Sequence, residues 1–516
     1  MAGKDYDVII IGSGVGGLSA GAILAREGLR VLVLEQGPRT GGCCSNYNEN
    51  GFRPETGAGY VICEEVLYGL FELLGLRLED HLDLRPVETP YDLIFDDGSR
   101  VLLPGEPEEI AEVVASISPG DVEGYYRYCA DMNMIHGSLL SMLEPPLPDI
   151  RQLSSLSTFA GRLSGREQLQ ALPISLRLAA SSLQKTTDSY FRHEKVRLLF
   201  SWKSTFSATP PYRSNGLFSL PGYPGGANFH YPRGGMESIP KALGIIIERS
   251  GGEVRTGVTV AKITVEGGNA TGVKIAGGDL ITSRAVVSNA HSRITYLDLV
   301  GLEHLPYHLR RAVKRQPCSM PTPAIHLGLN CRLDSIRAQS TAVLPGRAVT
   351  DSFWHLYYNK GLLSRPDDTP FLVNSASQGD RSLAPPGKQV LSAVSIAPYR
   401  LKHHEWDDLA EQWAGECIAS LERRAFPGLG SVVEWIDPVT PVEMERRLKL
   451  PGGGSYGLEM SMSNLGPFRP GWRSPAVEGL YLTGQCTNPG AGLPGVMISG
   501  MIASSCLLND WTGGLD

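Results

Sequence analysis

The feature that most constrains the fold is a strand, a glycine-rich turn, a helix and a second strand within residues 7–35. An uncharged run of β-branched residues, 8–11, predicts a strand buried on both faces. The turn at residues 12–17 reads Gly-Ser-Gly-Val-Gly-Gly and leads into a helical pattern over residues 18–27. A second strand follows and ends at Glu35. Together these elements form a βαβ unit, which indicates an α/β fold.

Each of three glycines in this turn has a separate physical task. Gly12 permits the tight turn, Gly14 lets backbone N–H groups approach a pyrophosphate, and Gly17 lets the helix pack closely against the strand. Glu35 follows at the distance of about 20 residues at which a carboxylate accepts from the ribose hydroxyls of an adenosine. The whole pattern therefore predicts a dinucleotide site and argues against a plain tight turn.

The residues after Glu35 distinguish between dinucleotides. Residues 35–43 read Glu-Gln-Gly-Pro-Arg-Thr-Gly-Gly-Cys. Arg39, Gly41 and Gly42 resemble the Arg-x-Gly-Gly extension of flavoproteins of the glutathione-reductase and amine-oxidase type. In those proteins the paired glycines lie against the FAD pyrophosphate and the arginine contacts it. The resemblance favours FAD over NAD.

Composition excludes several classes of protein. The chain has 516 residues, of which 42% are hydrophobic and 20% charged, as expected for a loop-rich globular enzyme of two or three domains. A net charge of −7 argues against a general nucleic-acid binder. The nine cysteines include no C-x-x-C pair and no zinc-type spacing, so we expect no metal. Because the fold begins at Asp7, we expect no signal or transit peptide and a cytoplasmic protein.

Signals of the first domain return twice later in the chain. Residues 238–248 predict a helix, and short strands follow it up to Asn289. Residues 479–484 predict a strand and residues 496–508 a helix. Glycines and prolines interrupt the uncharged run before that helix, which argues for a buried helix and against a membrane span. We expect a discontinuous FAD-binding domain of residues 1–88, 228–305 and 475–516.

The remaining residues, 89–227 and 306–474, predict a second, substrate-binding domain. Residues 91–103 alternate around Asp97-Gly98, which is typical of a β-hairpin. Residues 105–225 read mainly as helices and loops. A helix is expected over residues 409–424, and further strands over residues 324–329, 371–375 and 390–396. The predicted fold class is thus α/β, with a Rossmann-type FAD-binding domain joined to an α+β substrate domain built on an antiparallel sheet.

One part of the helical region, Arg151–Lys203, carries nine basic and three acidic residues. A basic amphipathic helix can lie on an anionic membrane surface, whereas an ordinary helix with a core side and a solvated side has the same pattern. We keep both interpretations, a peripheral membrane contact and an ordinary helix. The apolar residues expected on one helical face are Leu169, Leu172, Leu176, Ala179, Ala180 and Leu183.

Three motifs in order resemble one family. The first is the N-terminal βαβ unit with Arg39-x-Gly41-Gly42, and the second is Tyr231-Pro232-x-Gly234-Gly235-Met236. The third and most diagnostic motif is Gly-Leu-Tyr-Leu-Thr-Gly at residues 479–484, followed by Pro-Gly-Ala-Gly-Leu-Pro-Gly-Val at residues 489–496. Together they resemble the bacterial-type phytoene desaturases, a family that includes carotenoid cis-trans isomerases and retinol saturases. The resemblance implies a two-lobed flavoprotein with a tunnel for a long polyene or polyprenyl chain.

The resemblance also implies which residues bind FAD. Gly484 and Gln485 would approach the ribityl chain and pyrophosphate, and Val258 would hold the adenine by backbone contacts. The backbone of Val496 and Met497, at a helix N-terminus, would face the flavin pyrimidine and stabilise the negative charge of the reduced ring. The complete expected set is Gly12, Ser13, Gly14, Gly16, Gly17, Glu35, Gln36, Gly37, Arg39, Gly41, Gly42, Val258, Gly484, Gln485, Gly495, Val496 and Met497.

Flavin chemistry requires few catalytic side chains. Hydride transfer takes place at flavin N5, so the protein mainly binds, orients and excludes water. Polar residues near the expected flavin site are Glu55, Thr56, Tyr60 and three that we single out as catalytic candidates, His230, Tyr456 and Glu459.

A second G-x-G-x-x-G pattern, at Gly452, Gly454 and Gly457, follows no strand and lacks a suitable acid about 20 residues on. We interpret it as a substrate-side loop and expect no NAD(P) domain. The electron acceptor is then a quinone, oxygen or a separate reductase. A redox-neutral isomerase would need only a pre-reduced flavin.

Three classes of function follow. The leading one is an FAD enzyme that desaturates, saturates or isomerises a carotenoid or another polyprenoid. The second is an amine-oxidase-like flavoenzyme. The third is a non-enzymatic prenyl-lipid-binding relative of the same fold, against which the intact flavin motifs argue.

Overall fold

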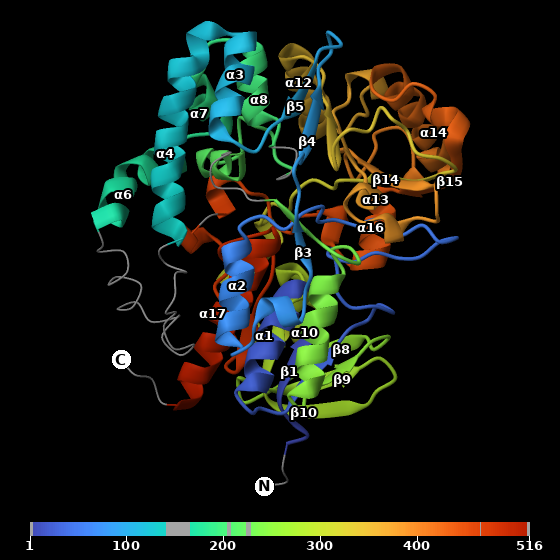
Figure 1. Ribbon diagram of the computed structural model, residues 1–516. Helices are drawn as coiled ribbons and strands as arrows, with labels where there is room; N and C mark the ends of the chain where they lie inside the picture. The colour runs from blue at the N-terminus through green and yellow to red at the C-terminus, as the bar shows by residue number, and fades with distance from the viewer. Residues whose placement is uncertain (1–3, 141–165, 204–207, 223–228, 465, 513–516) are drawn as a thin grey trace.

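Two seven-stranded sheets organise the chain. The computed structural model describes residues 4–140, 166–203, 208–222, 229–464 and 466–512. A small two-stranded sheet, β3 (Leu84–Pro86) with β6 (His230–Pro232), accompanies the two large ones. In Figure 1 the first large sheet lies in the lower half of the molecule and the second in the upper half.

The first sheet is mainly parallel, in the order β7-β2-β1-β10, and β16 pairs with the other side of β10. An antiparallel hairpin, β8 and β9, continues from the first residues of β10. These strands are β1 (Tyr6–Ile11), β2 (Val31–Leu34), β7 (Glu253–Arg255), β8 (Val260–Glu266), β9 (Asn269–Ile275), β10 (Leu280–Ser288) and β16 (Leu480–Leu482).

Helices that accompany this sheet come from both ends of the chain. They are α1 (Val15–Arg26), α2 (Glu64–Leu73), α10 (Ser238–Arg249) and α17 (Leu493–Thr512). Helix α1 contacts both α10 and α17, and every residue from Val15 to Ala25 is buried. The added Cβ of an alanine at Gly500 in α17 would lie 2.6 Å from the carbonyl oxygen of Gly16. Glycine therefore lets these two helices touch through their backbones.

The second sheet runs in the order β15-β11-β14-β13-β12-β4-β5. All neighbouring strands are antiparallel except β4 and β12, which are parallel. Its strands are β4 (Tyr91–Ile94), β5 (Arg100–Leu103), β11 (Ala324–Leu329), β12 (Ser340–Val343), β13 (Phe371–Asn374), β14 (Gln389–Val394) and β15 (Val433–Val439).

Two groups of helices surround the second sheet. A layer at the upper left of Figure 1 consists of α3 (Pro107–Ile117), α4 (Val122–Leu140), α6 (Arg166–Ala179), α7 (Leu183–Tyr190) and α8 (Glu194–Ser201). The second group consists of α12 (Arg347–Trp354), α13 (Ala376–Gly379), α14 (Trp406–Arg424), α15 (Leu429–Val432) and α16 (Pro441–Leu448). Helix α11 (Tyr307–Arg315) belongs to the first sheet instead, because its buried Val313 packs in one cluster with Ile9 and Leu32.

The structure confirms the α/β fold class and differs from the sequence-based prediction in detail. The second sheet is not wholly antiparallel, because β12 joins β4 in parallel. The last helix begins at Leu493, earlier than predicted, since Pro494 and Gly495 are tolerated in the first turn of a helix, where no intrahelical donor is needed. Among the described residues, no helix combines the length and hydropathy required to cross a bilayer. The domain boundaries remain a prediction.

The expected continuous leucine face was wrong. Helix α6 ends at Ala179, and Ser182 caps a new helix by accepting from the Lys185 N–H at 3.2 Å. Leu183 is consequently buried, whereas Leu169, Leu172 and Leu176 remain 58%, 50% and 61% exposed. The buried side of α6 is formed instead by Ala171 and Leu178. Residues 151–165 of the basic segment lie outside the described residues.

A buried carboxyl group joins the loop at residues 45–56 to the Tyr231–Met236 motif. Glu55 is 4% exposed, and its Oε1 accepts from the Tyr231 hydroxyl at 2.5 Å and from the Met236 N–H at 2.8 Å. Its Oε2 has no hydrogen-bond partner among the described residues. Burial raises the pKa of Glu55 to about 7, although the bonds from Tyr231 and Met236 oppose that change. This carboxyl group is therefore protonated over a wider pH range than an exposed one.

Substitution of Gly500 by Ala is expected to lower the thermal unfolding midpoint. The new methyl group would meet the Gly16 carbonyl oxygen at 2.6 Å, and overpacking of this kind costs about 1–3 kcal/mol. Gly244→Ala in α10 is the matched control, because its Cβ would meet nothing within 4 Å and helix propensity favours alanine. Thermal unfolding followed by circular dichroism should therefore show a lower midpoint for Gly500→Ala and a higher midpoint for Gly244→Ala. Equal midpoints for the two variants would contradict tight α1–α17 packing.

The pKa of Glu55 predicts a pH-dependent stability. An unfolded glutamate has a pKa of about 4.3, so between about pH 4.5 and about pH 7 the folded chain holds a proton that the unfolded chain releases. Stability should fall as pH rises through this window and level off above it. Glu55→Gln removes this contribution, so the midpoint difference between wild type and variant should change across the window. A difference independent of pH would contradict the raised pKa.

Candidate functional site

The candidate site lies where four parallel strands of the first sheet end. Ile11 is opposite both Leu34 and Ser288, and Ser288 is opposite Leu482. The segments that follow these strands therefore meet at one edge, as in other doubly wound folds with a ligand site. Backbone bonds hold them there, from the Gly12 N–H to Leu34 O at 2.8 Å, from Asn289 N–H to Ile11 O at 2.8 Å and from Thr483 N–H to Ser288 O at 3.0 Å.

Glycines let three backbone segments approach one another at this edge. An added Cβ at Gly17 would overlap the carbonyl oxygen of Gly12, and one at Gly16 would lie 2.9 Å from the Gly484 Cα. Gly12 itself has a φ of +89°, which favours glycine. The second glycine pair lies alongside, since the Gly41 N–H donates to Ser13 O at 2.9 Å. The structure thus brings together Gly12–Gly17, Gly41–Gly42 and Gly484.

The start of α1 is suited to an anion. Gly14 is the N-cap residue and provides no side-chain hydrogen bond, and the first turn contains no acidic residue. The first N–H groups of the helix and its positive dipole end are therefore directed at the glycine-lined edge. This arrangement fits the diphosphate of a dinucleotide. The structure supports the expected location of this group, while the individual binding residues remain predictions.

The Glu35 side chain accepts hydrogen bonds that connect the glycine-rich turn to the segment after β2. Its Oε2 accepts from the Ser13 N–H at 2.9 Å and the Ser13 hydroxyl at 2.8 Å, and its Oε1 accepts from the Gly37 N–H at 2.7 Å. The Val258 N–H donates to the Glu35 carbonyl at 2.8 Å. Glu35, Ser13, Gly37 and Val258 are therefore neighbours, and their contact with FAD remains a prediction. Gln36 beside them is exposed.

Arg39 is placed differently from the rest of the predicted set. Its side chain is exposed, and its guanidinium lies over the Tyr47 ring at 5.9 Å from the centroid. The structure does not bring this group to the start of α1 by any hydrogen bond among the described residues. Contact with a diphosphate would require another rotamer of this long side chain.

Asn289 is a central residue that the sequence-based set omits. Its Nδ2 lies 2.5 Å from the position of a Cβ at Gly14, and its amide oxygen would overlap a Cβ at Gly484. The Asn289 side chain therefore fills the space between the two glycine segments. The available signal was its place directly after β10, a strand that the sequence predicts to end beneath the cofactor.

The start of α17 forms the other end of the edge. Its first turn contains no acidic residue, and Met497 is buried while Val496 is partly exposed. A Cβ at Gly495 would lie 2.6 Å from the Gly490 carbonyl oxygen, so the preceding loop packs directly on the helix. A second helix N-terminus is thereby held near Gly484 and Gln485.

Arg469 and Trp472 hold the loop that connects β16 to α17, and no sequence pattern indicates either residue. Arg469 is buried, and it donates to the carbonyl oxygens of Gln485 at 2.5 Å and Thr487 at 3.0 Å. The Trp472 indole N–H donates to the Asn488 carbonyl at 3.0 Å. A loop rich in glycine and proline is in this way given one conformation by side chains that precede it.

A histidine and two cysteines lie beside the same loop. The His291 Nε2 is 3.8 Å from the Cys318 Sγ, and both His291 and Cys486 are buried. Burial alone would raise the pKa of Cys486, but His291 outweighs it and lowers this pKa to about 7. Positive charge is therefore favoured on His291, next to Gln485.

Glu459, one of the predicted catalytic residues, is a buried carboxylate with two partners. It is 1% exposed, and it accepts from Arg213 Nε at 2.8 Å and from the Tyr358 hydroxyl at 2.9 Å. Arg213 also lies over the Tyr358 ring. These contacts connect Glu459 to the loop that contains Arg213, which follows α8, and to Tyr358, which follows α12.

Tyr456 and His230, the other two predicted catalytic residues, lie on different elements: Tyr456 in the loop after α16 and His230 in β6. The Tyr456 N–H donates to the Ser319 hydroxyl at 2.9 Å, and burial raises the pKa of the Tyr456 phenol. The His230 Nδ1 is 2.8 Å from Glu64 Oε2, and the His230 backbone pairs with Val61. No hydrogen bond among the described residues connects these two with each other or with Glu459.

The second glycine pattern packs against the candidate site. A Cβ at Gly457 would lie 2.9 Å from both the Cys486 Sγ and the Gln485 Cγ. This loop therefore lines the side of the site that faces the second sheet. It has no preceding strand of the kind that begins a dinucleotide motif, since residues 451–453 form a short 3-10 turn after α16.

Known proteins are similar to this chain along nearly its whole length. The zeta-carotene-forming phytoene desaturase of Myxococcus xanthus is 27% identical over 503 residues, which cover 97% of this chain and 93% of that protein. The 4,4'-diapophytoene desaturase of a Methylomonas species is also 27% identical, with coverage of 97% and 94%. An oxidoreductase of known structure from Methanosarcina mazei has a TM-score of 0.60 at 19% identity, covers 96% of this chain and shares the fold.

The family model described as flavin-containing amine oxidoreductase matches residues 15–508, which include every segment of the glycine-lined edge after Gly14. The predicted resemblance to phytoene desaturases and the prediction of a flavin-dependent oxidoreductase are confirmed. The chain belongs to the flavin-containing amine oxidoreductase family.

Proposed function

We propose that this protein is an FAD-dependent enzyme that desaturates carbon–carbon bonds of a long lipophilic polyene. The observation that carries the proposal is the similarity to phytoene desaturases over 97% of the chain. The glycine-lined edge and the apolar interior of the second lobe support it. A saturase or an isomerase of the same family would use the same cofactor site.

The proposal of FAD rests on the two helix N-termini at the glycine-lined edge, those of α1 and α17. Helix α1 would hold the diphosphate and Glu35 the adenosine ribose, while Val258 would meet the adenine through its carbonyl because its N–H is already bonded to Glu35. At the other end, the Val496 and Met497 backbone would face the flavin ring. When bound, FAD accepts a hydride at N5.

The protein has to accept the second hydrogen as a proton. Removal of a hydride from one carbon leaves its neighbour to lose a proton, which requires a base. We assign this role to His230, whose Nδ1 lies 2.8 Å from the Glu64 carboxylate and can be oriented by it. Tyr456 directly precedes Gly457, which packs against Gln485, and would border the reacting carbons. Glu459 would act through position, because Arg213 and Tyr358 already occupy its carboxylate.

Electrons must leave the flavin for another acceptor. The single glycine motif with a preceding strand is taken by FAD, so we propose a quinone, oxygen or a separate reductase as acceptor. Exclusion of water from the apolar lobe would favour hydride transfer from the substrate over side reactions.

An anaerobic flavin spectrum tests the reaction. Purified protein mixed with liposomes that contain phytoene, with no acceptor added, should lose the absorbance of oxidised flavin, because hydride leaves the substrate. Reoxidation of pre-reduced protein by the polyene would instead indicate a saturase, and isomerised product with the flavin still reduced would indicate an isomerase. No spectral or chemical change in either arm would contradict a carotenoid substrate.

We also propose that α6 contacts the membrane from which such a substrate is taken. Leu169, Leu172 and Leu176 lie at i, i+3 and i+7 and are at least half exposed, and Lys185 and Arg192, later in the same basic segment, are exposed cations. An exposed leucine stripe in a basic segment suits an anionic bilayer surface. Arg177 itself is engaged by Asp131.

Substitution of Leu172 and Leu176 by serine should reduce flotation with anionic phosphatidylglycerol liposomes by at least about tenfold, since two leucine side chains would no longer enter the bilayer. Leu280→Ser is the control, because Leu280 is 57% exposed on β10 of the first sheet. Equal flotation of all variants would contradict membrane contact through α6.

A further inference from the structure

Helix α11 presents a group of cations that no carboxylate neutralises. Arg311, Lys314 and Arg315 are exposed, and within the described part of the chain their side chains form no ion pair and no hydrogen bond. The other side of the helix packs on the first sheet through the buried Val313. The helix therefore has an apolar inner side and a basic outer side, although the chain as a whole has a net charge of −7.

Helix stability explains only part of this pattern. Lys314 and Arg315 lie in the last turn, where a cation also interacts favourably with the helix dipole, but Arg311 lies before that turn. Glu303 is the acidic residue nearest in sequence, and it turns away from the helix. Its two carboxylate oxygens would lie 2.6 Å from a Cβ at Gly301. The three cations are thus left facing solvent.

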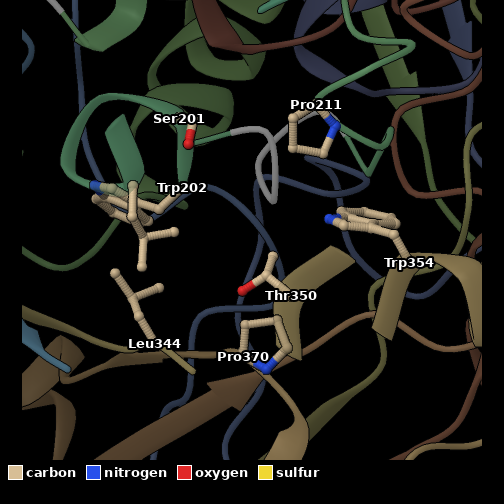
Figure 2. Close-up of a pocket in the computed structure, with 8 residues that line it drawn as sticks. Ser201, Trp202, Pro211, Leu344, Thr350, Trp354 and Pro370 are labelled. Atoms are coloured by element: carbon tan, nitrogen blue, oxygen red, sulfur yellow. The ribbon is translucent and has the colours of Figure 1, made fainter. Parts of the chain in front are cut away.

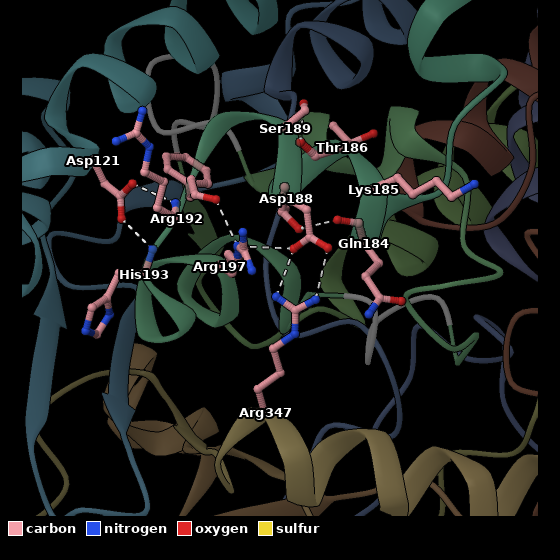
Figure 3. Close-up of polar contacts among 12 residues, drawn as sticks. Asp121, Gln184, Lys185, Thr186, Asp188, Ser189, Arg192, His193, Arg197 and Arg347 are labelled. Atoms are coloured by element: carbon pink, nitrogen blue, oxygen red, sulfur yellow. Dashed lines mark hydrogen bonds and ion pairs between the residues drawn. The ribbon is translucent and has the colours of Figure 1, made fainter.

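Arginines of the second lobe are paired instead. Figure 3 shows Arg347 of α12 with Asp188 of α7, with distances of 2.8 Å and 3.1 Å between its guanidinium nitrogens and the two carboxylate oxygens. Arg197 of α8 lies 3.3 Å from the same carboxylate. A cation paired in this way attracts a distant molecule little, because the carboxylate opposes its field. The unpaired cations of α11 have no such opposition.

An aromatic side chain accompanies these cations. Tyr307 is 74% exposed, more than any other large hydrophobic residue in the described part of the chain. Tyr307, Arg311 and Arg315 lie at i, i+4 and i+8, so they form one row along the helix. Tyrosine and arginine are enriched in protein interfaces, whereas a helix on a membrane exposes several aliphatic residues. The α11 surface, formed by Tyr307, Arg311, Lys314 and Arg315, therefore suits an acidic protein.

The pocket in the second lobe differs from this surface in size and charge. Figure 2 shows it between Trp202 and Trp354, and none of the eight described residues that line it is charged. Its cavity of about 20 Å³ has room for little more than one water molecule. A partner recognised by negative charge finds no complementary group there.

The segment after α11 leads directly to the candidate cofactor site. Arg293 donates to the Gln316 carbonyl at 2.6 Å and so holds the end of the helix. The Ser319 N–H donates to the Gly457 carbonyl at 2.9 Å. A Cβ at Gly457 would lie 2.9 Å from the Cγ of Gln485, one of the predicted FAD-binding residues. Covalent bonds, a hydrogen bond and packed atoms thus provide electrons with a continuous path from the site to α11.

We infer that the α11 surface binds an acidic one-electron carrier protein, which receives the electrons removed from the substrate. The inference rests on the proposed function and specifies a separate protein among the acceptors named there. Removal of two hydrogen atoms from the substrate yields two electrons and two protons. Two carrier molecules therefore take one electron each, and the protons pass to water. Exposed charges suit this task, because they speed the encounter without making the complex long-lived.

The test is the binding of the acidic haem domain of cytochrome b5 to the purified protein, measured by surface plasmon resonance. Arg311→Gln/Arg315→Gln should weaken binding about tenfold at low ionic strength, and the difference should shrink as salt screens the charges. Tyr307→Ala should weaken binding with little dependence on salt. The matched control is Arg249→Gln/Arg337→Gln, which removes two exposed arginines from other elements. Unfolding midpoints monitor folding.

Three outcomes would overturn the assignment of this surface. They are the absence of saturable binding to wild type, equal binding by wild type and Arg311→Gln/Arg315→Gln, and an equal loss in the control variant. Loss of flotation with anionic liposomes in Arg311→Gln/Arg315→Gln, with carrier binding intact, would show a membrane contact instead and would also overturn it.

A second measurement separates the surface from the reaction. Under anaerobic conditions phytoene should bleach the flavin equally in wild type and Arg311→Gln/Arg315→Gln, because the α11 surface lies outside the candidate cofactor site. Subsequent reduction of the cytochrome should be about tenfold slower in the variant. Equal rates of cytochrome reduction would contradict the inference. Absence of bleaching in wild type would contradict the proposed function, while the binding result would still decide whether α11 is a docking surface.

Discussion

The structure depends on backbone contact without side chains at the start of α1. Gly17 lies against Gly12, Gly16 lies against Gly484, and Gly500 lies against the Gly16 carbonyl. A methyl group at any of these places would separate a helix from the sheet or from α17 by a fraction of its own diameter. Since protein interiors do not compress, the displacement would pass to every segment at this edge. The geometry of the candidate cofactor site thus depends on the absence of side-chain atoms at these glycines.

Much of the fold could be predicted from the sequence, because local patterns specify many of its elements. The β1–α1–β2 unit, the β4–β5 hairpin and β11 each have a short-range signature, and the structure contains all of them. The strands β12 and β15 lacked one: β12 is four residues long, and β15 contains Asp437 and Pro438. Their pairing is decided by neighbours far along the chain.

The site residues also divide into those that a local pattern indicates and those that only the folded structure brings to the site. Glu35 and the glycines belong to a continuous motif, so spacing alone indicates them. Asn289 contacts the motif from a separate segment, and only its place directly after β10 points to it. Arg469 and Trp472 hold the loop before α17, and nothing in their local sequence marks a residue with that role. Glu459 shows the converse, since its position near the last motif suggested chemistry, while its partners Arg213 and Tyr358 come from distant elements.

The two sheets are joined by directional polar bonds from one short segment. Glu55 bonds to Tyr231 and Met236, whereas the Tyr60 hydroxyl bonds to Pro90 O and, at 2.7 Å, to the Ser340 hydroxyl of β12. The Gln339 amide adds a bond to Gly59 O at 3.1 Å. Such bonds depend on angle as well as distance, so they define the orientation of the lobes more narrowly than apolar contact would.

The pairing of β16 with β10 has a consequence for the newly made chain. On the ribosome, the strand and the helix that complete this edge, β16 and α17, emerge long after β1, α1 and β2, because the whole second sheet lies between them in the sequence. Until then the apolar side of α1 that α17 covers stays exposed to other chains, and such long-range closure is slow. A delay in translation before residue 480 would therefore leave a nascent chain with this apolar surface exposed and its cofactor site incomplete. We expect chaperones to bind the chain at that stage.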